Sequence, residues 1–258
     1  MELQNKHAIV TGSGHGIGRE IALLLAANGA SVTIGDIDLE RAQAVAKEIE
    51  IKGGNSQAVE VDVSIGSQVD NLISKAFNDF GTLDILVNNV GIGLHYSMVD
   101  TTEDDWDHVH AVNLKGPFLC SREAAKIMIQ QGKGGRIINI GSTAADNARV
   151  DAAAYCASKA GVLQLTKVMA LELGQYDITA NAVCPGLTDY ETSLNTAPPN
   201  YRKAFLSQVS MGRTCHASEI AEAVLFLASS RASFINGEVL HVDGGYSAGK
   251  PNVSRHAT

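Results

Sequence analysis

Short apolar runs alternate along the chain with longer segments in which apolar residues recur at helical spacing. The apolar runs span residues 7–11, 31–35, 58–63, 83–89, 136–142, 178–184 and 238–242. Segments of helical period span residues 38–52, 68–80, 102–112, 116–131 and 152–173, and Ile17, Ile21, Leu24 and Leu25 form a stripe that ends near residues 28–29. Because the runs are apolar almost throughout, both faces of the predicted sheet are expected to be covered.

Strands that alternate with helices predict an α/β fold with a doubly wound parallel sheet and helices on both faces. We expect one domain over residues 1–258, because no repeat, low-complexity tract or linker interrupts the pattern. Residues 187–213 are irregular and include Pro198 and Pro199. An insert of this length in a compact domain is typical of a binding loop or lid.

Composition narrows the classes of partner. The 258 residues carry 20 Lys plus Arg against 28 Asp plus Glu, a net charge of −8, which argues against a nucleic-acid or anionic-membrane binder. No run approaches the roughly 20 apolar residues of a membrane-spanning helix. Glu2 and Lys6 stand where an export signal needs apolar residues, so a cytoplasmic protein is expected. The four cysteines lack CxxC spacing, and we expect no metal site.

A glycine-rich turn follows the first predicted strand and opens the first predicted helix. It consists of Gly12, Ser13, Gly14, His15, Gly16, Ile17 and Gly18. Such a turn lets backbone N–H groups approach a pyrophosphate at the positive end of the helix. A turn that merely closes a strand–helix unit is the alternative, and its position between strand and helix favours the dinucleotide site.

Asp36 follows the second predicted strand, 18 residues after Gly18. A carboxylate at this position can accept hydrogen bonds from the hydroxyls of an adenosine ribose, and it would repel a 2′-phosphate. A solvated acid at a strand end is the alternative. The spacing indicates NAD as the cofactor rather than NADP.

A tyrosine and a lysine lie one helical turn apart in the segment 152–173. Tyr155 and Lys159 are spaced i, i+4 and therefore share one face of the helix. A lysine cation stabilises a phenolate and so favours a tyrosine acting as a base near neutral pH. Ser142 ends the preceding strand and can donate a hydrogen bond to a substrate oxygen. Such a pair on an ordinary exposed helix surface is the alternative.

Together these motifs make the chain resemble the short-chain dehydrogenase/reductase family, in order and over residues 6–246. The matching positions are residues 11–18, Asp36, Val61, Asp62, Val63, Asn88, Asn89, Val90, Gly91, Asn113, Ser142, Tyr155, Lys159, Pro185, Gly186 and residues 242–245. The resemblance implies a Rossmann-type fold and hydride transfer between a nicotinamide cofactor and a carbinol carbon.

The resemblance also implies roles for particular residues. Tyr155 would be the general acid/base, Lys159 would hold the nicotinamide ribose, and Ser142 would orient the substrate oxygen. Asn113 would hold a water that links Lys159 to solvent. Further cofactor contacts are implied for Asp62 and Val63 beside the adenine, Asn89 in the adenosine ribose region, Thr188 at the carboxamide, and Gly91, Pro185 and Gly186.

Some positions depart from the family pattern. Tyr190 stands where a threonine is frequent, and His15 stands where NADP-preferring relatives often carry arginine. Histidine is mostly neutral at physiological pH, so Asp36 decides the prediction in favour of NAD. The substrate pocket is expected around His95, Asn147 and residues 187–213.

The leading hypothesis is an NAD-dependent dehydrogenase acting on a small-molecule secondary alcohol or ketone: a polyol, sugar, cyclic or aryl alcohol. An NADPH-dependent 3-oxoacyl thioester reductase is the alternative among enzymes, and Asp36 speaks against it. A non-catalytic nucleotide-binding scaffold is the alternative outside enzymes; it would lack Tyr155, Lys159 or Ser142. The resemblance implies a homotetramer or dimer formed through residues 106–131 and 152–173.

Overall fold

The computed structural model describes residues 1–189 and 199–249. Its main sheet has the order β3-β2-β1-β4-β5-β6-β9, with every neighbouring pair parallel. The strands are β1 His7–Thr11, β2 Ser31–Asp36, β3 Ser56–Glu60, β4 Ile85–Asn88, β5 Gly135–Ile140, β6 Ile178–Pro185 and β9 Val239–Val242. This is the predicted doubly wound parallel sheet, and the order reverses beside β1, where such folds bind ligands.

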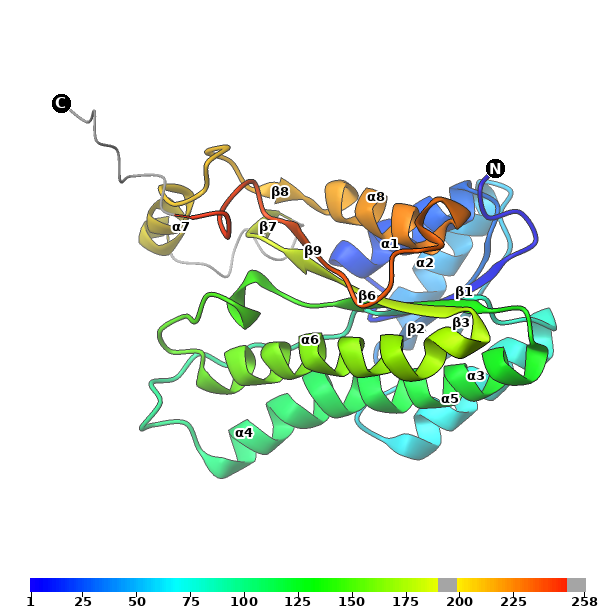
Figure 1. The fold of residues 1–258 in the computed structure, drawn as a ribbon, viewed down its shortest axis with the longest axis horizontal. Helices are drawn as coiled ribbons and strands as arrows, with labels where there is room; N and C mark the ends of the chain where they lie inside the picture. The colour runs from blue at the N-terminus through cyan, green and yellow to red at the C-terminus, as the bar shows by residue number, and fades with distance from the viewer. Residues whose placement is uncertain (190–198, 250–258) are drawn as a thin grey trace.

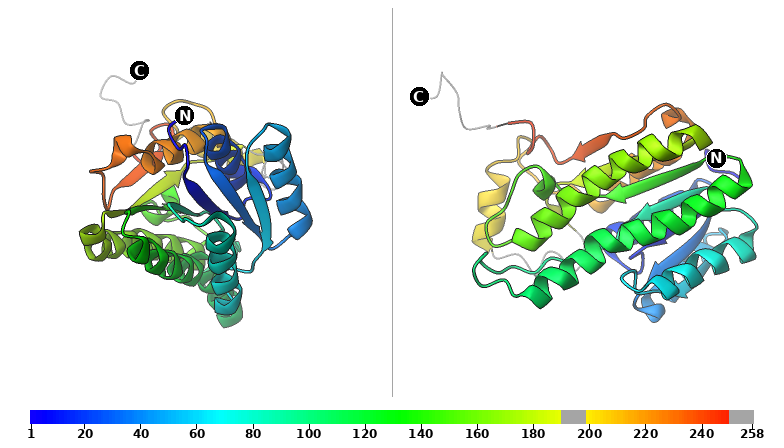
Figure 2. Two further views of the ribbon diagram at one scale, coloured as in Figure 1. Left: turned by 90° about the vertical axis from the view of Figure 1, so that its right-hand side faces the viewer. Right: turned by 60° about the horizontal axis from the view of Figure 1, so that its bottom comes forward.

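Helices cover both faces of the sheet (Figure 1). On one face lie α1 Gly16–Ala27, α2 Leu39–Ile51 and α8 Ala217–Ala228. On the other lie α3 Gly66–Phe80, α4 Glu103–His110, α5 Gly116–Gln131 and α6 Ala153–Leu173. Two views in Figure 2 show the same layers from the side and from below.

Side chains along each buried strand point alternately to the two faces of the sheet, which explains why both faces are apolar. In β1, Ala8 and Val10 join the core beneath α1, α2 and α8, whereas Ile9 joins the core beneath α3 and α5. Ile138 and Ile137 of β5 divide in the same way. Successive side chains of a strand point to opposite faces, so a strand covered on both sides needs apolar residues throughout.

The region expected to be irregular contains regular structure. β7 Thr188–Asp189 pairs in parallel with β8 Cys215–His216, and α7 Pro199–Leu206 lies between them in the chain. Residues 190–198 lie outside the described part. Arg202 of α7 forms two hydrogen bonds of 2.8 Å with the Asp189 carboxylate, so an ion pair fixes the helix to the strand pair.

Two helices predicted as separate are joined. A π-helical turn, Ala111–Lys115, connects α4 directly to α5. Gly116 and Pro117 predict a helix break, but the helix continues through them. Pro117 has no N–H to donate to the preceding turn, and that turn is the π turn, where the regular hydrogen-bond ladder is already interrupted. Isolated π turns are frequent at functional sites, and this one contains Asn113.

Candidate active site

The glycine-rich turn has the tight backbone that the sequence predicts. Gly12 and Gly16 have φ values of 62° and 57°, a region that favours glycine. A Cβ on Gly18 would overlap the carbonyl oxygen of Gly12, so the helix start and the end of β1 are in direct contact. This close contact brings the positive end of α1 to the carboxyl edge of the sheet.

Asp36 meets this turn from the end of β2. Its carboxylate accepts a hydrogen bond from the N–H of Gly14 at 2.8 Å and another from the N–H of Asp38 at 3.1 Å. The residue is only 5% exposed. A negative charge is therefore fixed against the loop in which a dinucleotide phosphate and ribose are expected.

Side chains from the neighbouring strand ends support the same edge. The Asn89 amide donates to the carbonyls of Thr11 and Gly12 at 3.1 and 2.9 Å, which fixes the start of the turn. Asp62 accepts the backbone and hydroxyl hydrogens of Ser64 at 2.9 and 2.7 Å. Val63 is buried beneath Gly116. Asn89, Asp62 and Val63, which are predicted to contact the cofactor, thus follow β3 or β4 at the carboxyl edge of the sheet.

Lys159 and Tyr155 lie at the start of α6. Lys159 is 3% exposed, and its Nζ donates to the carbonyl oxygen of Ile140 at 2.9 Å. The same Nζ lies 6.0 Å from the centre of the Tyr155 ring. Burial lowers the pKa of Lys159 to about 8. The predicted pair therefore consists of a buried amine and a tyrosine that it can influence electrostatically.

Ser142 follows the same strand end that contacts Lys159. It begins a short 3-10 turn, Thr143–Ala145, and its Oγ accepts the N–H of Ala144 at 3.1 Å. Because Oγ is the acceptor in that contact, its hydroxyl hydrogen can donate to a substrate oxygen. The end of β5 thus brings Ser142 and Lys159 together.

Asn113 is fully buried and fixes the chain next to this site. Its Oδ1 accepts the N–H of Ile92 at 2.8 Å, and its Nδ2 donates to the Ile92 carbonyl at 2.9 Å and to Ser158 Oγ at 3.1 Å. A Cβ on Gly91 would lie 3.0 Å from Lys159 Nζ and 3.7 Å from Asn113 Oδ1. Asn113 and Lys159 therefore flank the same glycine, and the expected water relay between them stays a prediction.

The remaining predicted residues are distributed around this centre. A Cβ on Gly93 would lie 3.5 Å from His95 Nε2 and 3.7 Å from Tyr155 Cδ2, so His95 lies beside the tyrosine. Thr188 is buried, and its hydroxyl donates to the carbonyl of Gly186 at 3.1 Å in the turn that follows Pro185. Asn147 donates to Ser247 Oγ at 3.0 Å, which ties it to the C-terminal segment. Tyr190 lies outside the described residues.

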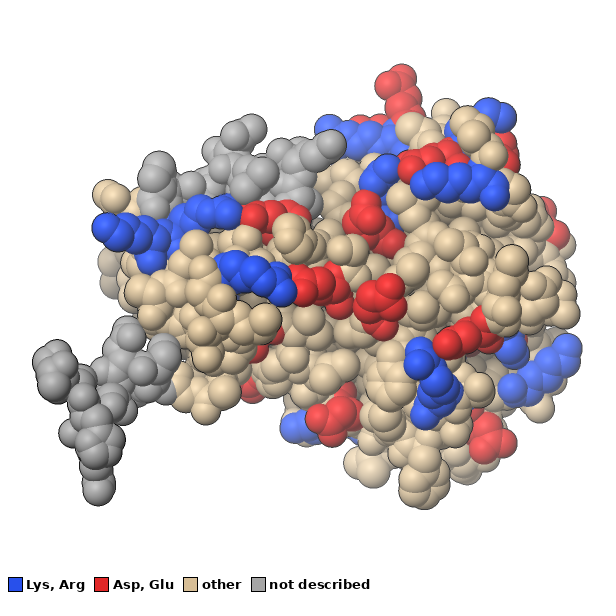
Figure 3. Space-filling model, turned by 90° about the horizontal axis from the view of Figure 1, so that it is seen from above, with Lys and Arg blue, Asp and Glu red and all other residues tan. Residues whose placement is uncertain are grey.

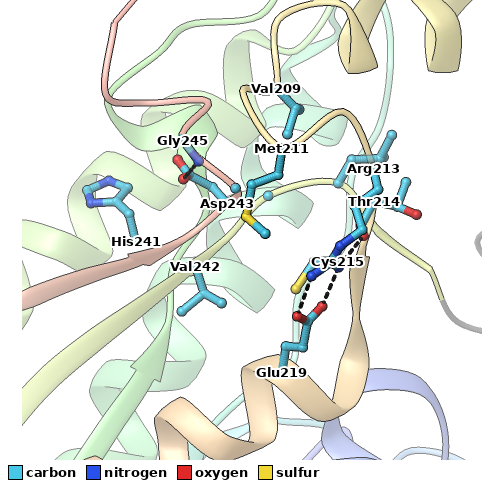
Figure 4. Close-up of a pocket in the computed structure, with 13 residues that line it drawn as sticks. Val209, Met211, Arg213, Thr214, Cys215, Glu219, His241, Val242, Asp243 and Gly245 are labelled. Atoms are coloured by element: carbon cyan, nitrogen blue, oxygen red, sulfur yellow. Dashed lines mark hydrogen bonds and ion pairs between the residues drawn. The ribbon is translucent and has the colours of Figure 1, made fainter.

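A cavity of about 220 Å³ is lined in part by the turn at Gly186 and Leu187, and Figure 4 shows other residues that line it. Its lining includes Cys215, Asp243 and the ion pair between Arg213 and Glu219. None of the catalytic candidates lines it. The cavity therefore contains none of the proposed catalytic side chains, although it shares Gly186 with the predicted cofactor contacts.

Nicotinamide cofactors fit the residues present. Glycines leave space beside the α1 terminus and beside Lys159, where a Cβ on Gly91 would meet the amine at 3.0 Å. Within residues 1–189 and 199–249, no cluster of three His, Cys, Asp or Glu side chains could hold a metal ion. All four cysteines are free thiols.

The charge of the surface and the composition of the helices concern two possible partners, nucleic acid and the membrane. On the face shown in Figure 3, lysines and arginines alternate with acidic residues and form no continuous basic patch among the residues described there. No helix within the described ranges is long and apolar enough to cross a membrane.

Comparison with known proteins supports the resemblance. A family model described as enoyl-(acyl carrier protein) reductase matches residues 12–247. A short-chain dehydrogenase/reductase from Armillaria gallica is 40% identical over 250 residues, which cover 94% of this chain and 96% of that protein. The chain belongs to the short-chain dehydrogenase/reductase family. It is therefore related to oxidoreductases that use a nicotinamide cofactor and act on small molecules.

Two other relatives differ in their described activities. A 3-oxoacyl-[acyl-carrier-protein] reductase from Staphylococcus epidermidis is 39% identical over 242 residues, with 93% of this chain and 98% of that protein covered. The crystal structure of a putative gluconate dehydrogenase from Agrobacterium tumefaciens superposes with a TM-score of 0.92 at 34% identity, covering 96% and 98% of the chains. The family and fold are thus shared by relatives that are described with different substrates.

Proposed function

We propose that the protein is an NAD-dependent dehydrogenase that transfers a hydride between NAD(H) and a secondary alcohol or ketone, with Tyr155 as the general acid/base. The observation that supports this most strongly is the position of the Lys159 amine. It is buried, held by the Ile140 carbonyl at 2.9 Å, and lies 6.0 Å from the Tyr155 ring. A surface pair without function would not require burial of the cation, which is costly.

Each residue of the site has a distinct task in this proposal. A nicotinamide ring supplies the hydride acceptor when the cofactor is bound. The Lys159 cation stabilises Tyr155 as the phenolate, and this phenolate accepts the proton of the substrate hydroxyl and becomes the neutral phenol. Ser142 donates a hydrogen bond to the substrate oxygen and so orients it. Asn113 holds Ile92, which keeps the chain at Gly91 open beside the amine.

Asp36 supports NAD as the cofactor. Its carboxylate is buried against Gly14, where a 2′-phosphate would meet a fixed negative charge. The other predicted contacts are assigned to the same cofactor: the turn 12–18, Asp62, Val63, Asn89, Gly91, Pro185, Gly186 and Thr188.

An NADPH-dependent 3-oxoacyl thioester reductase is the second candidate. The relative from Staphylococcus epidermidis is described with that reaction. A Cβ on Gly14 would lie 2.8 Å from Arg41 Cβ, so a cationic residue also starts beside the loop. The Arg41 side chain forms an ion pair with Asp38 at 3.0 Å, which opposes its use for a phosphate.

The assembly and location stay predictions. Exposed apolar side chains on the helices of the predicted interface, among them Trp106, Phe118, Val168 and Leu171, support a homo-oligomer, tetramer or dimer. A cytoplasmic location is consistent with the free cysteines.

Turnover with NAD⁺ and with NADP⁺ tests the proposal. The substrates are polyols, sugars, cyclic and aryl secondary alcohols, and 3-hydroxyacyl thioesters, and the reaction is followed by the absorbance of the reduced cofactor. We expect activity with NAD⁺ on a secondary alcohol. Activity confined to NADP⁺ and thioesters would establish the second candidate instead, and binding without turnover on any substrate would favour a scaffold.

A further inference from the structure

Arg149 places a guanidinium group close in the chain to Ser142, the proposed substrate-orienting serine. It lies in the segment between β5 and α6, and its Nη2 donates to Thr143 Oγ1 at 2.8 Å. Thr143 directly follows Ser142. The backbone N–H of Arg149 contacts the Sγ of Cys156 at 3.4 Å, next to Tyr155. The arginine is thus held by the residue that follows Ser142 and by the residue that follows Tyr155.

No carboxylate within the described residues forms an ion pair with this guanidinium. Every other described arginine except Arg136 pairs with an Asp or Glu side chain. The Arg149 Nε is buried and has no hydrogen-bond partner, although the residue as a whole is half-buried. A buried donor without an acceptor is costly, and an incoming anion would remove that cost.

Two acids on neighbouring segments are already engaged, and the exposed Asp151, two residues further along the chain, forms no ion pair with Arg149. Asp146 pairs with His241 at 2.8 Å, and Asp189 pairs with Arg202 at 2.8 Å. Since both carboxylates have cationic or imidazole partners, neither is available to neutralise Arg149. Among the described residues, no carboxylate neutralises the guanidinium at Thr143, so its charge is open to an anionic ligand.

A cation–π contact holds the guanidinium in place. Its carbon lies 5.1 Å from the centre of the Phe205 ring in α7. Phe205 stacks in turn on Tyr246, with ring centres 4.5 Å apart and planes 8° from parallel. In Figure 1, α7 lies at the same end of the molecule as the start of α6. A guanidinium held over a ring keeps N–H groups with which it can bind a carboxylate through two hydrogen bonds.

We propose that Arg149 binds a carboxylate of the substrate while Ser142 and Tyr155 contact its reacting oxygen, so that the substrates are hydroxy acids and their oxo acids. This inference rests on the proposed function and narrows its substrate class. Phe205 and Tyr246 hold the guanidinium in place and are positioning residues.

Matched pairs of substrates test this assignment. Gluconate is compared with sorbitol, and 3-hydroxybutyrate with its amide, because each pair shares hydroxyl groups and differs in the carboxylate. In the wild-type protein we expect the acid of at least one pair to have the higher kcat/KM. Arg149→Gln should lower that value by about 10- to 100-fold and leave the value for the neutral partner nearly unchanged.

Two further variants separate recognition from folding. Arg149→Lys keeps the charge and should restore part of the kcat/KM for the acid, mainly through KM. Arg231→Gln is the matched control, because the Arg231 guanidinium also lies over a phenylalanine ring, that of Phe226, at 5.4 Å. It should leave kcat/KM unchanged for both substrates. An equal loss for acid and neutral partner in Arg149→Gln, or a wild-type preference for the neutral partners, would overturn the inference.

Calorimetric binding of gluconate and 3-hydroxybutyrate to the NADH-loaded protein provides a readout that does not need turnover. Binding to the wild-type protein that Arg149→Gln weakens by about tenfold or more, without any turnover, would support the carboxylate site and refute the proposed reaction. Turnover of neutral alcohols without measurable binding of either acid would refute the carboxylate site and leave the proposed reaction intact.

Discussion

Replacing Lys159 by methionine removes a buried cation from beside Tyr155 and retains a long side chain in its place. In the folded protein the amine lies 6.0 Å from the centre of the phenol ring. At an effective dielectric constant of about 20, a unit charge at that distance stabilises a phenolate by about 3 kcal/mol. This energy corresponds to about two pH units in the ionisation of the tyrosine.

Burial lowers the pKa of Lys159 to about 8, so the amine is still mostly charged at neutral pH. Its charge favours the phenolate, and the phenolate favours the charged amine in return, so the two groups titrate as a pair. In Lys159→Met the phenolate loses this support, and Tyr155 should ionise only at higher pH.

The near-ultraviolet absorbance of tyrosinate measures this without a substrate. The protein has six tyrosines, so the signal of Tyr155 is taken as the difference between each protein and the same protein carrying Tyr155→Phe. We expect the midpoint to rise by about two pH units in Lys159→Met. Lys115→Met, which removes an exposed lysine near the site, should leave it unchanged. A shift of less than about half a unit in Lys159→Met would refute the electrostatic role.

Two other substitutions have defined outcomes. Asp36→Ala removes the charge beside Gly14. The ratio of kcat/KM with NAD to kcat/KM with NADP should therefore fall by about tenfold or more. An unchanged ratio would show that other residues discriminate between the two cofactors. Burial lowers the pKa of His7 from 6.5 to about 4, so between those pH values the unfolded chain binds a proton that the folded chain does not. The free energy of unfolding should therefore fall by about 3 kcal/mol as the pH drops through this window, and urea titrations of His7→Gln should show that much less pH dependence.

Apolar periodicity was sufficient to predict the sheet and most of its helices. Each strand of the main sheet overlaps a predicted apolar run, because a strand buried on both faces has a distinctive composition. The end of the chain was harder to predict. Helix α8 was not identified from periodicity, and α7 lies in a segment that we expected to be irregular. An eight-residue helix held by the ion pair between Arg202 and Asp189 depends on tertiary contacts more than on local pattern.

The residue types of the candidate site could be predicted, but most of their contacts could not. The spacing of Tyr155 and Lys159 is enough to predict that they share a helix face. The hydrogen-bond partner of Lys159 is the carbonyl of Ile140, 19 positions away, which no spacing predicts. Asn113 holds Ile92 through a π turn that no spacing rule indicates. Arg149 was not singled out, since only the fold brings Phe205 and Tyr246 to it.

Tyr155→Phe tests the central claim most directly. The ring stays in place while the acid/base is lost. The rate of NADH formation with the best substrate, measured by stopped flow, should therefore fall by about 1,000-fold or more. The dissociation constant of NADH, measured by fluorescence, should change by less than about threefold. Hydride transfer near the wild-type rate in this variant would contradict the assignment of Tyr155 and the mechanism built on it.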